Sequence, residues 1–204
     1  MENLPVNLKI EHLIWEKNIE HIVGIDEAGR GPLAGPVVAA AVIFKPYEHI
    51  AGIKDSKELT PIQRQNFFEI IAEKAIAIGV GIIGNGIIDD INIRQATLLA
   101  MKRAIQTLSV APEYVLIDGR DKLDSFENQD ALIDGDQLSF TISAASIVAK
   151  VTRDRIMGRY HYKYPQFGFS HNKGYATRFH REMIKKFGTC QIHRQSFLSK
   201  VLEE

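Results

Sequence analysis

The sequence predicts an α/β domain, with helices packed on a central β-sheet and a helical C-terminal part. Continuous apolar runs of strand length occupy residues 36–44 and 75–83, as expected for strands buried on both faces. Helical spacing of apolar residues lies between and after these runs, and the C-terminal part contains only helical patterns. This succession is typical of a layered α/β fold.

The length and composition fit one domain. A chain of 204 residues, 45% of them hydrophobic, can enclose one core of this kind. We therefore expect a single domain over residues 1–204, with an α/β core at about 21–160 and a basic helical segment at about 161–204.

The first strands follow a short N-terminal helix. Residues 8–18 predict this amphipathic helix, and residues 22–26 predict a strand that ends in acidic side chains. Only a glycine-rich turn separates this strand from the apolar run at 36–44, so we expect the two to form a hairpin. Residues 114–117 predict a further strand, which also ends in an acid, Asp118.

Helices are predicted from capping residues and periodicity. Thr60, Pro61 and Gln63 form a helix start with a capping box, and the helix should run to about Lys74. It is expected to bury Phe67, Ile70 and Ile71. Further helices are predicted at 95–108, 143–160 and 176–187, and loops at 121–128 and 164–173. In the helix at 143–160, we expect Lys150 and Arg153 to be available on the outer side.

Cysteine content and hydropathy indicate the cellular location of the protein. The single cysteine, Cys190, excludes an intrachain disulfide and a zinc cluster built from cysteines. A reduced, cytoplasmic location fits best. We find no signal peptide and no apolar run of membrane-spanning length, so no membrane contact is expected. No extra apolar face is evident, and a monomer is expected.

The net charge of zero conceals an asymmetry along the chain. From Lys150 onward there are 12 basic and 4 acidic residues, whereas the preceding part has 13 basic and 21 acidic residues. A basic C-terminal part beside an acidic body suits a polyanion that is handled at a metal-loaded acidic site. A solvated helical face that happens to be basic is the alternative.

Acidic side chains stand at the ends of two predicted strands. Asp26 and Glu27 close the first strand, and Asp118 closes the strand at 114–117. Ligands of open α/β sheets bind beyond the carboxyl ends of the strands, where such acids would repel one another without a cation. A hard divalent cation such as Mg²⁺ binds carboxylate and phosphate oxygens, and two such ions make a phosphoryl-transfer site.

Two points stay open for these acids. Because neighbouring strand residues point to opposite faces, Asp26 and Glu27 can share a site only if the chain bends at Glu27. The alternative is that the acids merely form turns or caps, since Asp118 with Gly119 is a common turn dipeptide.

Other motifs are weaker. Glycine patterns of the dinucleotide-binding type occur at 29–34 and 79–84, but neither has the strand–turn–helix context that a Rossmann site needs. Lys57 beside a serine is a natural phosphate ligand, although an exposed loop explains it as well. Ser143 and Ser146 open a predicted helix, whose N-terminus attracts anions; they could equally be caps.

The stretch at 24–36, G-I-D-E-A-G-R-G-P-L-A-G-P, resembles the motif of bacterial ribonuclease HII, the type 2 ribonuclease H. Further blocks match the family in the same order: D-S-K at 55–57, L-I-D-G at 116–119, S-A-A-S-I-V-A-K-V-T-R-D at 143–154, Y-P-Q-F-G-F at 164–169, K-G-Y at 173–175 and H-R-Q-S-F at 193–197. The blocks cover residues from about 21 to 198, which makes the resemblance highly specific.

The resemblance implies a ribonuclease H-like fold, a central mixed β-sheet flanked by helices with a helical C-terminal segment over the substrate. It implies an endonuclease that hydrolyses the RNA strand of RNA/DNA hybrids and cuts 5′ of a single ribonucleotide in duplex DNA, leaving 3′-hydroxyl and 5′-phosphate ends. Such hybrids and ribonucleotide-containing duplexes are the implied partners. The implied cofactors are two Mg²⁺ or Mn²⁺ ions, and the implied roles are ribonucleotide removal in DNA repair and RNA primer removal.

The resemblance also assigns residues. The family's catalytic, metal-binding acids map onto Asp26, Glu27, Asp118 and Asp136. The fourth position has a competitor, because L-I-D-G recurs at 132–135 and places Asp134 where the family usually has a lysine.

Substrate-binding residues follow from the same blocks. Gly29, Arg30 and Gly31 map onto the family's glycine-arginine-glycine motif, whose backbone reads the 2′-hydroxyl of the ribonucleotide. Tyr175 maps onto the tyrosine that packs on the sugar of the following deoxynucleotide. The phosphate backbone is expected to be held by Lys57, Ser143, Ser146 and Lys150, together with basic C-terminal side chains.

The sequence is also compatible with two rival hypotheses. Seven histidines could support metal-independent RNA cleavage, which would leave 2′,3′-cyclic phosphate ends. The chain could also be a hybrid-binding module without activity, although all four candidate acids are present. A weak sliding-clamp contact is suggested by residues 137–140, Q-L-S-F, which we expect to form a strand.

Overall fold

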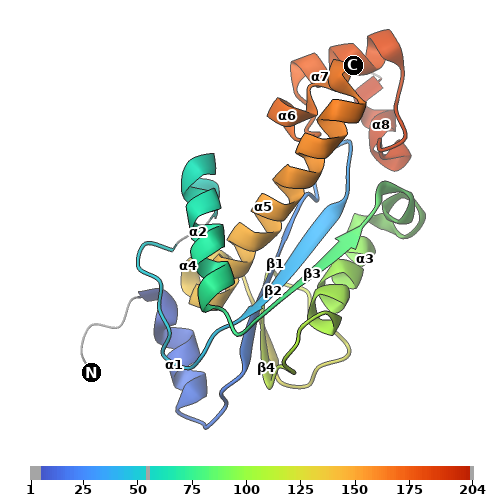
Figure 1. Cartoon of the computed structure of the whole chain (residues 1–204). Coiled ribbons are helices and arrows are strands. Elements are labelled where there is room, and N and C mark those ends of the chain that lie inside the picture. The colour runs from blue at the N-terminus through green and yellow to red at the C-terminus, as the bar shows by residue number, and fades with distance from the viewer. Residues whose placement is uncertain (1–5, 54–55, 203–204) are drawn as a thin grey trace.

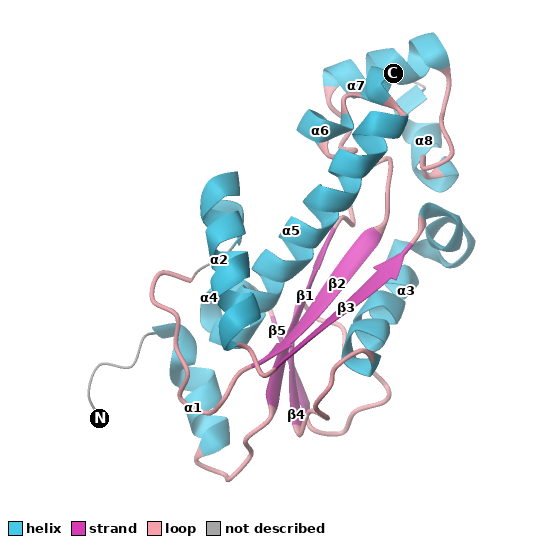
Figure 2. Cartoon of the chain, viewed as in Figure 1, coloured by secondary structure: helices cyan, strands magenta, loops and turns pink. Residues whose placement is uncertain are grey.

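The computed structural model describes residues 6–53 and 56–202, so Asp55 of the D-S-K block lies outside the described residues. Within them, the strands form one mixed sheet in the order β3-β2-β1-β4-β5 (Figure 2). The strands are β1 (Ile22–Ala28), β2 (Val37–Ile43), β3 (Ala77–Ile83), β4 (Tyr114–Asp118) and β5 (Gln129–Leu132).

β1 is the central strand and has two kinds of neighbour. It pairs antiparallel with β2, which confirms the predicted hairpin, and β2 pairs antiparallel with β3. On its other side β1 runs parallel to β4, which in turn is parallel to β5. The carboxyl ends of β1 and β4 therefore meet at one edge, as the acidic strand ends had predicted.

Helices cover both faces of this sheet (Figure 1). The longer helices are α1 (Lys9–Trp15), α2 (Pro61–Lys74), α3 (Asn85–Gln106), α5 (Phe140–Lys163), α7 (Arg178–Phe187) and α8 (Gln195–Leu202). Short helices are α4 (Gly135–Leu138) and α6 (Phe169–Asn172), and single 3-10 turns span Val6–Leu8, Ser56–Glu58 and Pro165–Phe167. The predicted capping box of α2 is present, since Thr60 and Gln63 exchange side-chain to backbone hydrogen bonds.

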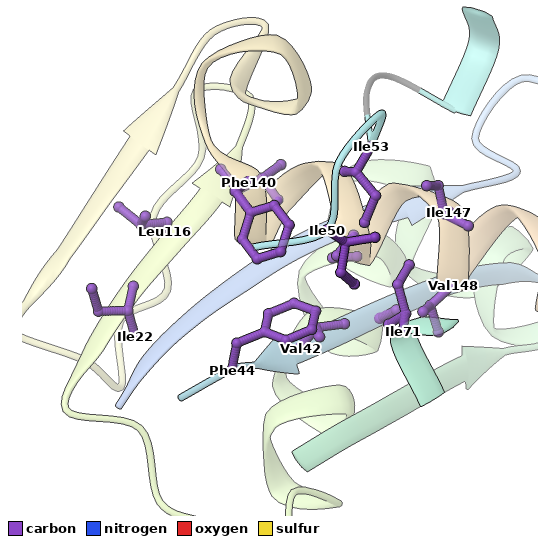
Figure 3. Close-up of a cluster of buried hydrophobic side chains, with 14 of the residues drawn as sticks. Ile22, Val42, Phe44, Ile50, Ile53, Ile71, Leu116, Phe140, Ile147 and Val148 are labelled. Atoms are coloured by element: carbon purple, nitrogen blue, oxygen red, sulfur yellow. The ribbon is translucent and has the colours of Figure 1, made fainter. Parts of the chain in front are cut away.

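One face of the sheet packs against α1, α2 and α5. Figure 3 shows Phe44 of this face beneath Phe140 of α5, with Val42 and Val148 in the same buried cluster. Close approach depends on Gly24 of β1, where a Cβ atom would lie 2.1 Å from the backbone of α5.

The opposite face packs against α3. Gly79 and Gly81 of β3 allow this contact, because a Cβ at either glycine would lie 1.9 Å from a carbonyl oxygen of α3. The glycine pattern at 79–84 therefore serves helix–sheet packing and not a dinucleotide.

A third apolar cluster joins the C-terminal helices to the far end of α5 (Figure 1). Its buried members come from the turn after β1, from α5 and from the chain beyond Tyr164: Leu33, Ala34, Met157, Phe167, Phe169, Ile184, Ile192 and Leu198. The turn after β1 is thus packed between the sheet and the C-terminal helices.

Several predicted boundaries were wrong. α5 begins at Phe140, with Ser139 as its cap, and not at Ser143. Residues 137–140 do not form the predicted strand, because Gln137 and Leu138 end α4, Ser139 is the cap of α5 and Phe140 is its first residue. α3 begins at Asn85, ten residues before the predicted start, with a kink at Asn92, whose φ is 65°. Ile70 of α2 is 36% exposed, since it lies outside the face that contacts the core.

Two elements were missed and one loop is partly helical. β5 and α8 had no predicted counterpart, and the predicted loop at 164–173 contains a 3-10 turn and α6. Arg153 is 1% exposed, contrary to its predicted outer position, because its guanidinium donates to buried backbone carbonyls.

Candidate active site

A cavity of about 250 Å³ opens where the carboxyl ends of β1 and β4 meet. β1 stays paired with β2 as far as Ala28, but its pairing with β4 ends at Ile25. The cavity therefore lies beside the last residues of β1, which are no longer paired with β4. The lining residues include Asp26, Glu27, Gly29, Arg30, Gly31, Ser56, Lys57, Asp118, Ser146, Lys150, Arg153 and Tyr175.

Asp26 and Glu27 both line this cavity without the bend that had been expected at Glu27. Asp26 is 5% exposed, and one oxygen of its carboxylate accepts the Glu27 backbone N–H at 2.6 Å. Burial, together with the acidic neighbours Glu27 and Asp118, raises the pKa of Asp26 well above its usual range.

Glu27 shares the effect of burial but has a cation beside it. Arg30 donates from Nη1 to Oε1 of Glu27 at 3.2 Å. Burial raises the pKa of Glu27, while the Arg30 charge and hydrogen bond oppose the rise.

Asp118 ends β4 and is fixed by the chain that follows β5. Its Oδ1 accepts the backbone N–H of Gly135 at 2.8 Å. Burial raises its pKa, and the Gly135 hydrogen bond and the positive charge of Lys57 act against this rise.

The competing acids Asp134 and Asp136 occupy different environments. Asp134 is exposed and takes a left-handed conformation, with φ 55°, at the start of α4. Asp136 is 2% exposed, and Lys57 donates from Nζ to its Oδ2 at 3.1 Å. Asp136 does not line the cavity, but it contacts Lys57, which does.

The carboxylate oxygens of this cavity are the kind of ligand that a hard divalent cation prefers, but their side chains lie too far apart to surround one. In residues 6–53 and 56–202, no group of three or more acidic, histidine or cysteine side chains is gathered tightly enough to hold a metal as it stands. Asp26, Glu27 and Asp118 nevertheless present oxygen donors to one cavity, and each has a pKa raised by burial. Buried carboxylates that repel one another are stabilised by a bound cation.

The predicted substrate-binding residues are mostly brought together. Gly29, Arg30, Gly31, Lys57, Ser146, Lys150 and Tyr175 line the cavity. Gly29 has φ +100°, and a Cβ there would overlap Arg153, whereas a Cβ at Gly31 would meet only Tyr175, at 3.8 Å. The Gly31 backbone is therefore open toward the cavity. Lys150 also pairs with Asp154, whose Oδ1 accepts from its Nζ at 2.8 Å.

Ser143 has a structural role in place of the predicted phosphate contact. It is fully buried, and its hydroxyl donates to the carbonyl oxygens of Asp136 at 2.6 Å and Ser139 at 2.8 Å. Because α5 starts three residues earlier than predicted, Ser143 lies in the first turn and ties α4 to α5.

Two buried arginines were missed as parts of the site. Arg153 donates to the carbonyls of Ala34, Pro36 and Lys173, and Arg194 donates to those of Gly29, Arg30 and Gly35. Both hold the turn after β1. The only sequence signal was their position inside the S-A-A-S and H-R-Q-S-F blocks.

The histidines do not supply a rival acid–base site. His180 and His193 form a buried pair, 0% and 1% exposed, with 3.1 Å between their Nε2 atoms. Among the described residues, none of the cavity-lining side chains is a histidine. Neither ring of the pair can reach a substrate in the cavity.

Comparisons with known proteins agree with the resemblance. The family model described as ribonuclease HII matches residues 23–200. A ribonuclease HII of Syntrophus aciditrophicus (strain SB) is 50% identical over 191 residues, which are 93% of this chain and 90% of that protein.

Solved structures give the same result. The ribonuclease H2 of Pyrococcus horikoshii OT3 has a TM-score of 0.76 at 28% identity, covering 90% of this chain and 97% of that one. The ribonuclease HII in the PCNA complex from Archaeoglobus fulgidus has a TM-score of 0.72 at 25% identity, covering 86% and 94%. The predicted ribonuclease H-like fold is confirmed. Along the described part of this chain, no helix is both long and apolar enough to cross a membrane.

Proposed function

Because this chain belongs to the ribonuclease HII family, and is therefore an endoribonuclease that degrades the RNA of RNA/DNA hybrids, we propose that its acidic cavity holds divalent metal ions and cuts beside a ribonucleotide. The observation that carries the proposal is the meeting of three carboxylates, one buried and two partly buried, with a glycine-rich turn in one cavity. The proposed cleavage is on the 5′ side of the ribonucleotide, including one embedded in duplex DNA, and leaves 3′-hydroxyl and 5′-phosphate ends.

The proposed metal ligands are Asp26, Glu27, Asp118 and Asp136. Bound ions, Mg²⁺ or Mn²⁺, would activate water for attack on the phosphodiester and stabilise the leaving 3′-oxygen. Asp26, the most buried of the three cavity acids, would contribute its carboxylate to holding the ions. The raised pKa values of these acids support the assignment, because a bound cation lowers the cost of keeping them ionised.

Two basic side chains are proposed to exchange partners on metal binding. Arg30 forms an ion pair with Glu27, and Lys57 forms one with Asp136. With metal bound to the carboxylates, the two basic side chains would donate to the phosphates of the substrate. They would then hold the backbone of the strand that is cut.

Recognition of the ribonucleotide is assigned to the turn at 29–31 and to Tyr175. The backbone of Gly31 is open to the cavity, so a 2′-hydroxyl can approach its polar groups closely. Tyr175 is 45% exposed and lies over the same turn, where its ring can pack against the next sugar.

A second groove, of about 590 Å³, continues from the cavity through the shared residue Lys150. Its basic lining residues are Arg64, Lys150, Arg155, His171 and Lys173. This groove is the proposed path for the duplex beyond the cut, and it matches the positive charge of the C-terminal part. Binding should therefore weaken with salt.

A sliding-clamp contact is kept as a proposal with a different location. The relative from Archaeoglobus fulgidus was solved as a complex with PCNA. In this chain the clamp-like residues 137–140 do not suit that role, because Phe140, the first residue of α5, is fully buried in the core. A clamp contact would have to use another surface. Roles in ribonucleotide removal and RNA primer removal, a single-domain monomer and a cytoplasmic location complete the proposal.

One assay tests the proposed chemistry against both rivals. A DNA duplex with one ribonucleotide is incubated with Mg²⁺ and with EDTA, and the product ends are identified. The proposal predicts Mg²⁺-dependent cleavage 5′ of the ribonucleotide with a 3′-hydroxyl end. A 2′,3′-cyclic phosphate formed in EDTA would support cleavage by histidines, and binding without cleavage would support an inactive module.

A further inference from the structure

Two walls of the cavity would contact the sugars of the substrate: the Gly29–Gly31 turn and Tyr175, here called the sugar walls. They come from parts of the chain that lie far apart in sequence. We propose that His193 and Arg194 are positioning residues that hold the two sugar walls in fixed relation for ribonucleotide recognition. This inference rests on the proposed function, because it assigns to both walls a contact with the substrate.

Arg194 holds the first sugar wall. Its guanidinium is fully buried and donates to the carbonyl oxygens of Gly29 at 2.6 Å, Arg30 at 2.8 Å and Gly35 at 2.8 and 3.0 Å. A planar guanidinium can meet several carbonyls at fixed angles, which a lysine ammonium cannot do. Two of these carbonyls, those of Gly29 and Arg30, belong to the peptide units that lead directly to Gly31.

His193 holds the second sugar wall through His180. His193 Nδ1 accepts the backbone N–H of Cys190 at 2.8 Å, so its Nε2 carries the proton and donates to Nε2 of His180 at 3.1 Å. The proton of His180 is then on Nδ1, which donates to the carbonyl oxygen of Tyr175 at 2.8 Å. This hydrogen-bond chain has one consistent set of tautomers, and it ends on the peptide of Tyr175.

The rings of this pair are enclosed by aromatic residues. Phe167 and Phe169 pack against His180 and His193 with ring centroids 4.9 to 6.2 Å apart. Burial lowers the pKa of both histidines, and that of His193 falls to about 4. Both rings are therefore neutral at physiological pH, as the hydrogen-bond chain requires.

Backbone hydrogen bonds join the same three segments. Arg194 N–H donates to Leu33 O at 2.8 Å, and Leu33 N–H donates to Gly174 O at 2.8 Å. The segment at 173–175 and the turn after β1 are thus connected directly, and residues 193–194 are connected to both through side chains. A displacement of residues 193–194 would therefore move both sugar walls.

The dipeptide itself is anchored to the sheet by α3. Asn85 donates from Nδ2 to the carbonyl oxygen of His193 at 3.1 Å. The carboxylate of Asp89 accepts the backbone N–H groups of Gln195 and Ser196, both at 2.9 Å, at the start of α8. His193 and Arg194 are therefore held by the first turns of α3, which the buried Ile88 packs into the core, as positioning residues need to be.

The test uses two substrates, a DNA duplex with one embedded ribonucleotide and a hybrid of a continuous RNA strand with DNA. The measured quantity is the kcat/KM for the embedded ribonucleotide divided by the kcat/KM for the hybrid. Tyr175→Ala measures how far this ratio falls when the second sugar wall is removed. His193→Leu breaks the hydrogen-bond chain, while His193→Gln keeps an N–H near the former Nε2. Arg194→Met removes the donors to the turn, and Arg194→Lys keeps the charge but not the fork. Ile184→Val is the matched control, because Ile184 is a buried member of the same C-terminal cluster.

We expect His193→Leu to lower the ratio by about tenfold, with a smaller effect in His193→Gln and no further loss when His193→Leu is combined with Tyr175→Ala. Arg194→Met and Arg194→Lys should lower kcat on both substrates by about tenfold or more at unchanged folded fraction. Ile184→Val should lower Tm slightly and leave ratio and kcat within about twofold.

Equal ratios for wild type and His193→Leu, or Arg194→Lys with wild-type kcat, would overturn the proposal and leave these residues with a role in stability alone. Failure of the proposed function would look different. In that case the wild-type protein itself would not cleave the embedded ribonucleotide, and no ratio could be measured.

Discussion

Asp118 accepts, through Oδ1, a hydrogen bond of 2.8 Å from the backbone N–H of Gly135. Gly135 is the residue between Asp134 and Asp136, so this contact fixes how the two competing acids face the site. A Cβ at position 135 would lie 3.2 Å from Asp118 Oδ1 and 2.8 Å from Ile142, which leaves little room for any other residue. The turn directs Asp136 inward and Asp134 outward.

The two acids should therefore respond differently to the same substitution. Asp136→Asn removes a buried carboxylate beside Lys57 and should lower Mg²⁺-dependent kcat/KM by at least about 100-fold. Asp134→Asn changes an exposed side chain and should stay within about threefold. Steady-state cleavage of the embedded-ribonucleotide duplex measures both, and the reverse order of effects would move the fourth ligand to Asp134.

Two glycines of the turn provide a second matched pair. Gly31→Ala should keep Tm within about 2 °C, because the new methyl group meets only Tyr175 at 3.8 Å, yet it should lower kcat/KM about 100-fold by blocking the sugar. Gly29→Ala should destabilise the protein by about 1–2 kcal/mol or more, since φ is +100° and the methyl would overlap Arg153. Thermal unfolding and cleavage assays separate the two effects; full activity of Gly31→Ala would remove this turn from sugar recognition.

Asp26 should stabilise the protein less than an uncharged isostere when no metal is present. Its pKa is raised in the folded state, so its favourable contribution is present at low pH and is lost as pH rises through the folded pKa. Asp26→Asn should therefore raise Tm in EDTA at neutral pH, and the gain should shrink as pH falls toward 4. Each pKa unit of the rise corresponds to about 1.4 kcal/mol, or about 3–6 °C in Tm for a chain of this size.

Bound Mg²⁺ should make the Tm of the wild type higher than that of Asp26→Asn. Mg²⁺ binds the native wild type and should raise its Tm with concentration, while Asp26→Asn should gain much less. Differential scanning calorimetry with and without Mg²⁺ measures the effect. Equal Mg²⁺ stabilisation of both proteins would argue against Asp26 as a metal ligand.

The buried histidine pair should make the C-terminal helices sensitive to acid. Burial lowers the pKa of His193 to about 4 and also lowers that of His180, whereas the unfolded chain titrates near 6.5. The unfolded state thus binds more protons between these values, and stability falls as pH drops from about 6.5 toward 4. For His193 the slope should approach about 1.4 kcal/mol per pH unit, and His180 should add to it in the same direction.

The variant His193→Gln isolates this contribution. Its stability should depend less on pH below 6.5 than that of the wild type, whatever other groups titrate in the same range. Urea unfolding at a series of pH values gives the difference. Parallel curves for the two proteins would show that His193 is not responsible.

The sequence predicted the part of the site that follows strand ends. Asp26, Glu27 and Asp118 stand where apolar runs stop, and a sheet with parallel neighbours brings such ends together. The hairpin, the capped helix α2 and the strand β3 were likewise visible as local patterns. These elements are specified by residues close in sequence, which is why pattern and structure agree.

The remaining features depend on contacts between distant residues. β5 is a four-residue edge strand with polar members, and its pairing with β4 leaves no periodic signal. Arg153 and Arg194 look like surface cations, yet backbone carbonyls of the turn after β1 solvate them in the interior. Ser143 looked like a helix start because the Ser139 cap lies within a segment that had been assigned to a strand.

The most direct test of the central claim compares cleavage and binding by one variant. With a DNA duplex carrying one ribonucleotide in Mg²⁺, Asp26→Asn should lose at least about 1,000-fold in the single-turnover cleavage rate and bind the duplex within about threefold of wild type, because the turn, Tyr175 and the basic groove remain. Cleavage by Asp26→Asn at the wild-type rate would contradict a metal site built on the end of β1.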